Sequence, residues 1–72
     1  MPKLPLLSGS DVVKALERLG FAQVRHRGSH VVMRRGGVGT VVPLHKEVKT
    51  GTLAGILRQA QLGQDEFLGA VK

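Results

Sequence analysis

Two histidines and two arginines are concentrated in RHRGSH, the six residues from Arg25 to His30, which lie between two apolar runs. Solvated turns are usually built from small residues such as Gly, Ser, Asn and Asp. Imidazole is the side chain best suited to proton transfer near neutral pH, and guanidinium groups bind phosphate. The segment therefore predicts phosphate binding, proton transfer, or both.

His30 is the candidate for proton transfer. If Arg27 and Gly28 form a two-residue turn, Arg25 lies opposite His30 on the neighbouring strand. A nearby cation disfavours the protonated imidazole and a bound phosphate favours it, and a balance of these two effects suits a general acid or base. The alternative is that His30 is a partly buried residue that only hydrogen-bonds at the start of a strand.

A third histidine, His45, follows the third apolar run, at the head of a loop that also carries Lys46. If this loop folds toward the RHRGSH segment, His45 becomes a second group for phosphate binding or proton transfer. The alternative is a solvated loop histidine. Contacts to phosphate give affinity without sequence information. The cations that can make such contacts, or that can simply form a solvated surface, are Arg25, Arg27, Arg34, Arg35, Lys46 and Lys49.

Other kinds of catalytic site are not supported. His26 and His30 are four residues apart, which is a metal-ligand spacing on a helix, but four residues of strand span about 13 Å. We therefore expect neither a metal nor another cofactor. The GGVG segment lacks the Lys-Ser/Thr end and the following helix of a phosphate-binding loop, so it is expected to be a hairpin tip. Ser29 has no acid arranged for a catalytic triad, and we expect it to bond backbone or phosphate.

Composition restricts the partners. The chain has 72 residues, so we expect a single domain over residues 1–72 with a small core. Eleven Lys and Arg oppose five Asp and Glu, and the isoelectric point is about 11.0. This charge favours nucleic acid or an acidic protein as partner, the alternative being a basic surface that only maintains solubility. The two aromatic residues, Phe21 and Phe67, have core-like patterns, so RNA contacts are expected at phosphate, sugar and shape.

No cysteine is present, and no apolar run is long enough to span a membrane. The N-terminal stretch MPKLPLLSGS lacks the apolar centre of a signal peptide. We therefore expect a cytoplasmic protein with no membrane partner.

The elements that position these residues follow from the periodicity. Residues 8–21 predict a helix that Ser8 and Asp11 cap and Gly20 terminates. Short apolar segments at 21–27, 30–34 and 40–44, separated by glycine-containing turns, predict an antiparallel meander of three strands. Pro43 cannot donate a hydrogen bond to a strand ladder, so the third strand ends there or lies at an edge.

The helical period returns in residues 52–62, with Thr50 or Thr52 as the candidate cap. We expect Gly55 to allow a close approach of this helix to the sheet, and Gly63 to end it. Residues 64–72 predict a short last helix. The fold class is therefore α+β, in the order α-β-β-β-α-α, with the helices on one face of the sheet. The apolar positions expected to pack in these two helices are Leu53, Ile56, Leu57, Ala60, Phe67, Leu68 and Val71.

Between Ser8 and about Leu68 the chain resembles the HicA family of small toxin ribonucleases. The resemblance rests on the ordered set LxxxGF, RxxGSH, VPxH and GTLxxIL at these intervals. Relatives usually carry Gly followed by Ser or Thr at the end of the second helix. Here Gln61 and Gly63 stand instead, which implies that the break before the last helix is displaced by a residue or two. Relatives also often carry an aromatic residue in the second strand, which this chain lacks.

The resemblance implies a fold like a double-stranded-RNA-binding domain and a metal-independent endoribonuclease that acts on mRNA. It implies that His30 is the essential histidine, that Gly28 and Ser29 shape its turn, and that a HicB-type antitoxin neutralises the toxin. Attack of the ribose 2′-OH on phosphorus would be assisted by His30, with four candidate phosphate ligands: Arg25, Arg27, His45 and Lys46. Two alternatives remain: a non-catalytic double-stranded-RNA-binding module, and a protein-interaction domain with a basic face.

Overall fold

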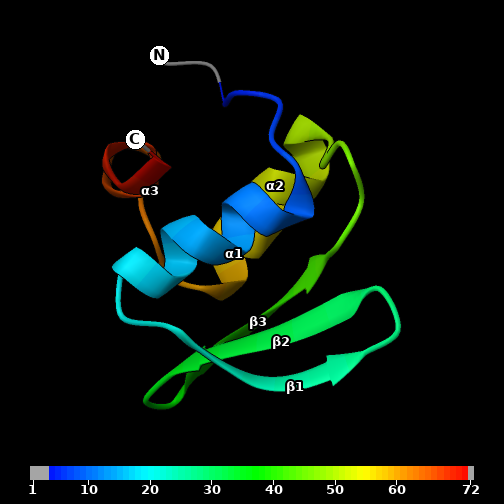
Figure 1. The fold of residues 1–72 in the computed structure, drawn as a ribbon. Helices are drawn as coiled ribbons and strands as arrows, with labels where there is room; N and C mark the ends of the chain where they lie inside the picture. Colours follow the sequence, from blue (N-terminus) through cyan, green and yellow to red (C-terminus); the bar gives the residue numbers. More distant parts are fainter. Residues whose placement is uncertain (1–3, 72) are drawn as a thin grey trace.

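The computed structural model describes residues 4–71, whose elements follow the expected order of helix, three strands and two helices (Figure 1). The α+β class and the antiparallel sheet are thus confirmed. Outside the described residues lie 1–3 and Lys72. Residues 1–3 belong to the stretch in which we expect no signal peptide, and Lys72 ends the expected last helix. Within residues 4–71, none of the helices has the length and apolarity needed to traverse a lipid bilayer.

Helix α1 (Gly9–Arg18) begins and ends as its sequence predicts. The Asp11 N–H donates to Ser8 Oγ at 3.1 Å, and the Ser8 N–H donates to Asp11 Oδ2 at 3.3 Å, which completes a capping box. Gly20, with φ of +96°, takes the left-handed conformation that lets the chain leave the helix. The apolar stripe of α1 is fully buried at Val12 and Leu16.

The three strands form one antiparallel sheet in the order β1-β2-β3. They are β1 (Ala22–Arg27), β2 (His30–Arg35) and β3 (Val38–Pro43). Strand β3 lies at an edge and ends at Pro43, as expected for a residue without an N–H. A bulge between Gln23 and Arg25 shifts the register of β1 against β2.

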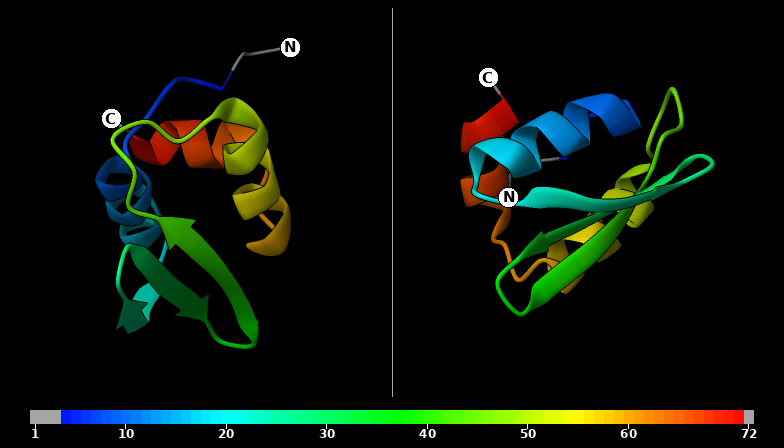
Figure 2. Two further views of the ribbon diagram at one scale, coloured as in Figure 1. Left: turned by 90° about the vertical axis from the view of Figure 1, so that its right-hand side faces the viewer. Right: turned by 60° about the horizontal axis from the view of Figure 1, so that its bottom comes forward.

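The sheet has a buried and an open face. Successive residues of a strand point to opposite faces, and the alternation is clear in β2, where Val31 and Met33 are buried. We call the side of these two residues the inner face; the helices cover it (Figure 2). We call the opposite side the outer face. From β2 it carries His30, Val32 and Arg34, none of which is buried.

Helix α2 (Thr50–Gln59) differs from expectation at its start. Its N-cap is the extended Lys49, without a side-chain hydrogen bond, so neither Thr50 nor Thr52 is the cap. The preceding residue, Val48, is held in an isolated antiparallel bridge, and the helix begins soon after that bridge releases the chain. The close approach expected at Gly55 is also wrong, because a Cβ there meets nothing within 4 Å.

The end of α2 is displaced toward the N-terminus from the expected Gly63. Gln61 has φ of +57° and turns the chain, and helix α3 (Gln64–Val71) follows. Phe67 is fully buried at the centre of the core. The expected apolar residues of α2 are all buried, whereas Leu68 and Val71 of α3 are only partly so. The buried residues of α2 and its C-cap are Leu53, Ile56, Leu57 and Ala60.

Candidate active site

The turn that precedes His30 consists of Gly28 and Ser29. The last Cα partners of the β1–β2 ladder are Arg27 and His30. Of the two turn residues only Gly28 has a positive φ, +54°, which matches the requirement of a type II′ turn for Gly at the first central position. Because Gly28 must hold that position, the alternative turn of Arg27 and Gly28 is wrong, and Arg25 does not lie opposite His30.

His30 is exposed on the outer face, and its cross-strand neighbour there is Arg27. Arg25 pairs with Val32 and so lies on the same face, one step further along the sheet. Arg25 and Arg27 are two residues apart in the regular part of the β1–β2 ladder, so both lie on this face. A phosphate beside His30 would therefore meet a guanidinium group from the adjacent strand. The alternative of a partly buried His30 is wrong, since the residue is exposed.

His26 belongs to the other face. It is the Cα partner of the buried Val31, and its Nε2 lies 2.9 Å from the carbonyl oxygen of Gly28. This contact supports the turn from the inner face. Since His26 and His30 point to opposite faces of the sheet, their rings cannot bind one ion. Among residues 4–71 no three His, Cys, Asp or Glu side chains are grouped so as to hold a metal ion.

The loop between β3 and α2 lies beside the turn (Figures 1 and 2). The Leu44 N–H donates to the carbonyl oxygen of Ser29 at 2.6 Å, so the backbone next to His45 is bonded to the backbone next to His30. His45 and Lys46 are both exposed. A role for His45 requires that this loop approach the turn, and the backbone of the loop does so.

The N-terminal segment fixes the loop in place. The Gly9 N–H donates to the carbonyl oxygen of His45 at 2.9 Å, and the Val48 N–H donates to that of Leu7 at 2.6 Å. A Cβ at position 9 would overlap the carbonyl oxygen of Pro43. Gly9 was not singled out by sequence analysis. The only signal was a glycine at the first position of a helix, where residues of higher helix propensity are usual.

The two arginines that end β2 have different surroundings. Arg35 Nη1 donates to the carbonyl oxygen of Leu19 at 2.9 Å, and its guanidinium carbon lies 4.9 Å from the centre of the Phe21 ring. Arg35 therefore caps the C-terminal end of α1. Arg34 points to the outer face and is exposed. The alternation of the strand thus separates a structural arginine from one that is open to a ligand.

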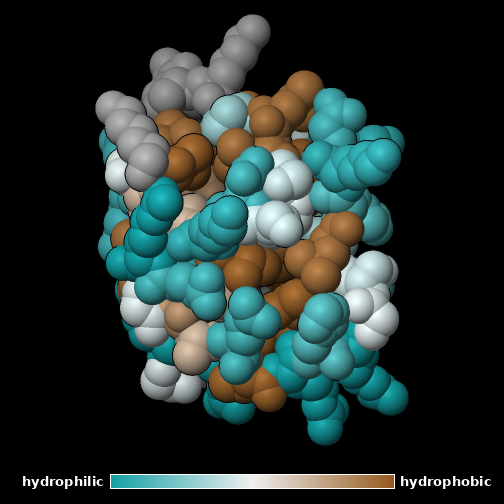
Figure 3. All heavy atoms as spheres, viewed as in Figure 1, coloured by the Kyte–Doolittle hydropathy of each residue, from teal (hydrophilic) through white to brown (hydrophobic). Residues whose placement is uncertain are grey.

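Positive charge dominates the outer face. Its ionisable residues on the strands are Arg25, Arg27, His30 and Arg34. The acidic side chains of the chain lie on α1, on α3 and in the loop before α2. They are Asp11, Glu17, Glu47, Asp65 and Glu66. Figure 3 shows hydrophilic side chains with hydrophobic ones between them over the lower part of the molecule, where the sheet lies.

A protein-family model described as HicA toxin of bacterial toxin-antitoxin matches residues 9–62. The matched part contains α1, all three strands and α2, together with the turn and the loop beside it. No curated protein matches the chain.

Proposed function

We propose that this chain, which belongs to the HicA family of toxins from bacterial toxin–antitoxin systems, is a metal-independent endoribonuclease that cleaves mRNA through His30. Membership of the family implies an antitoxin partner, and we propose that this partner is of the HicB type. One observation carries the catalytic proposal. His30 is exposed on a cationic face, directly across from Arg27 and beside the loop of His45 and Lys46.

The proposed chemistry needs only groups that surround this position. The neutral imidazole of His30 takes the proton of a ribose 2′-OH, and the 2′ oxygen attacks the adjacent phosphorus. The bond from phosphorus to the 5′ oxygen then breaks, leaving a 2′,3′-cyclic phosphate and a 5′-OH that receives a proton. Negative charge develops on the phosphoryl oxygens, and the Arg27 guanidinium group, aided by Arg25 and Lys46, stabilises it. His45 is the candidate donor of the proton to the leaving oxygen.

The 2′-OH is the nucleophile, so the proposed substrate is RNA and DNA is inert. Cleavage of an RNA oligonucleotide, in the presence of EDTA, is to be compared with that of the same oligonucleotide carrying one 2′-deoxyribose at the cleaved position. We expect the single deoxy substitution to abolish cleavage there and to leave other sites unaffected. Persistent cleavage at the substituted position would refute attack by the 2′ oxygen.

The role of His30 is tested with a matched histidine. His30→Gln should reduce the cleavage rate by roughly 100-fold or more, the usual range for a lost general acid or base. His26→Gln is the control, because it removes an imidazole of the same hairpin from the opposite face and keeps a donor for the Gly28 carbonyl oxygen. Circular dichroism must show both variants folded. Equal cleavage by the two folded variants would instead favour a binding module in which His30 has no chemical role.

Neutralisation by an antitoxin is tested with a co-expressed HicB-type protein. We expect it to bind the wild-type chain and to stop cleavage in proportion to the complex formed. An acidic antitoxin surface would complement the cations of the outer face, so binding should weaken with Arg27→Ala and with added salt. Inhibition without any binding would contradict direct neutralisation.

A further inference from the structure

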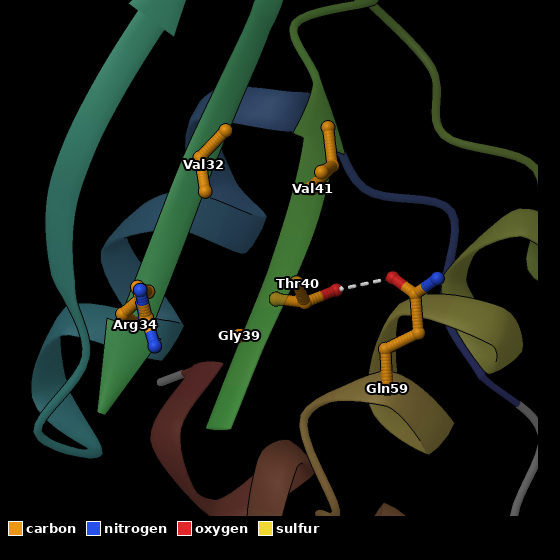
Figure 4. Close-up of a pocket in the computed structure, with 6 residues that line it drawn as sticks. All are labelled: Val32, Arg34, Gly39, Thr40, Val41 and Gln59. Carbon is orange, nitrogen blue, oxygen red and sulfur yellow. Dashed lines mark hydrogen bonds between the residues drawn. The ribbon is translucent and has the colours of Figure 1, made fainter. Parts of the chain in front are cut away.

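A groove on the outer face lies apart from the turn and takes no part in the proposed cleavage (Figure 4). It has a volume of about 460 Å³ and lies where β2 and β3 run side by side, next to the end of α2. Its floor is formed by Val32 and Val41, which are cross-strand partners. Val41 is 43% exposed, so an apolar surface stays open on a face that is otherwise cationic.

Gly39 keeps the groove open at one end. It is the cross-strand partner of Arg34, and a Cβ at position 39 would lie 3.4 Å from Arg34 Cγ. The absence of a side chain therefore leaves a space above the strand beside the Arg34 side chain (Figure 4). The φ of Gly39 is not in the left-handed region, so the backbone itself does not require glycine here.

The opposite side of the groove carries an oriented amide. The Thr40 hydroxyl lies 3.0 Å from Gln59 Oε1 and 3.2 Å from the carbonyl oxygen of Ile56, and its single proton serves these two acceptors. The hydroxyl thereby holds the Gln59 amide at the edge of β3. Amide and guanidinium groups are the side chains that most often hydrogen-bond the edges of nucleobases. The groove thus combines an apolar floor with two polar groups of that kind.

The groove is aligned with His30. Val32 and Arg34 follow His30 on the same strand and the same face, at about 7 Å and about 13 Å from it. An RNA strand that runs along β2 from a phosphate at His30 would pass over Val32 with its neighbouring nucleotide. No acidic side chain of residues 4–71 is carried by the strands that form this face, so nothing there repels the RNA backbone.

We propose that this groove binds one nucleobase of single-stranded RNA next to the cleaved phosphate. The base lies on Val32 and Val41, with its edge toward the Gln59 amide and the Arg34 guanidinium group against its plane or its phosphate. The groove therefore sets nucleotide preference, whereas the His30 turn supplies the chemistry. This inference rests on the proposed ribonuclease function.

The first test fills the groove without removing a charge. Gly39→Val places a branched side chain beside Arg34, and valine suits a strand. Gly37→Val is the matched control, because it adds the same atoms to the same hairpin at a position where a Cβ meets nothing within 4 Å. The readout is the Kd for a fluorescent single-stranded RNA in a His30→Ala background, so that no cleavage occurs. We expect Gly39→Val to raise the Kd about tenfold, within the range of losing the hydrogen bonds to one base edge, and Gly37→Val to change it less than twofold.

The second test removes the amide. Gln59→Ala leaves Thr40 bonded to the Ile56 carbonyl oxygen, so the fold has a second support. The Kd is measured for four RNAs that differ in the single base next to the cleaved phosphate. In the same His30→Ala background, we expect the protein with Gln59 intact to distinguish these bases by at least fivefold and Gln59→Ala to bring the four values together. Gln64→Ala, at the start of α3 and outside the groove, is the control.

The outcomes separate the groove from the proposed function. If the wild type does not cleave RNA but both groove variants alter RNA affinity, the base site stands and the nuclease proposal fails. If the wild type cleaves and neither variant changes affinity or base preference, the base site is wrong and the nuclease proposal stands. Loss of antitoxin binding with unchanged RNA binding would assign the groove to the antitoxin and overturn the proposal. If Gly39→Val does not fold, Gln59→Ala alone decides.

Discussion

Replacement of Gly9 by alanine is a sharp test of how the loop beside the turn is held. Alanine is the best helix former, so at the first position of α1 the substitution should be favourable by itself, by roughly 0.5–1 kcal/mol. The structure predicts instead that the substitution lowers the stability of the protein. The new Cβ would overlap the Pro43 carbonyl oxygen and lie 2.6 Å from the Leu44 Cα, and both obstacles are backbone atoms.

The magnitude follows from what must move. To reach an ordinary contact of 3.4 Å, α1 and the loop must separate by more than about 0.8 Å, because the Pro43 carbonyl oxygen is nearer still than the Leu44 Cα. This separation stretches the hydrogen bond from the Gly9 N–H to the His45 carbonyl oxygen. Overpacking costs about 1–3 kcal/mol and a lost hydrogen bond about 1 kcal/mol. After the gain in helix propensity, the net destabilisation is about 2 kcal/mol. For a domain of this size the melting temperature should fall by roughly 8–16 °C.

The assay is thermal and urea unfolding followed by circular dichroism, with Gly55→Ala as the control. Gly55 is also in a helix, but a Cβ there meets nothing within 4 Å, so alanine should stabilise the protein by about 1 kcal/mol. The same methyl group is thus expected to act with opposite sign at the two positions. RNA cleavage by folded Gly9→Ala, well below its melting temperature, should also be slower, because the loop of His45 is displaced. A Gly9→Ala protein that melts at or above the wild-type temperature would refute the close approach.

Three further substitutions have defined outcomes. Gly28→Ala should cost about 1–2 kcal/mol, because its φ of +54° is left-handed while the space around it is empty; an unchanged urea midpoint would contradict this. Ser8→Ala should lower stability by about 1 kcal/mol through loss of the capping box, measured by thermal unfolding. Arg35→Ala should destabilise the protein by about 1–2 kcal/mol, because the arginine caps α1, and should weaken RNA binding less than Arg27→Ala does. If Arg35→Ala weakened RNA binding more than Arg27→Ala, the RNA would bind the inner face, and the assignment to the outer face would be wrong.

Features that depend on a few consecutive residues were predictable from the sequence. The capping box of Ser8 and Asp11, the left-handed Gly20 and the strand end at Pro43 each follow from local backbone chemistry. The order of the helices and strands and most of the buried positions were also predictable, because they follow from the spacing of apolar residues along the chain. A prediction that rested on one glycine was less accurate: the chain turns after α2 at Gln61, not at the expected Gly63.

The register of the hairpin was not predictable. Every residue of β1 is exposed, so this strand has no buried set of side chains to identify which residues face the helices. The bulge after Gln23 adds a further shift that no sequence pattern marks. A turn displaced by one residue exchanges Arg25 for Arg27 as the neighbour of His30. That exchange decides which guanidinium group serves the proposed reaction.

Contacts between distant parts of the chain were also beyond the sequence. Gly9 meets Pro43 and Leu44 only after α1 has packed beside the end of β3, and Arg35 meets the end of α1 only because β2 runs back toward it. The sequence could therefore indicate the candidate site residues within the turn and the loop. The residues that hold that loop in place appeared only in the folded chain.

The loop between β3 and α2 is attached to its surroundings by main-chain atoms alone in the three bonds made by Leu44, His45 and Val48. Every residue type except proline offers the same main-chain donor, and every type offers the same acceptor. The side chains at positions 45 and 46 can therefore be exchanged without moving the loop. A substitution at either position therefore changes the charge presented beside the turn, while the framework that carries these two positions stays constant.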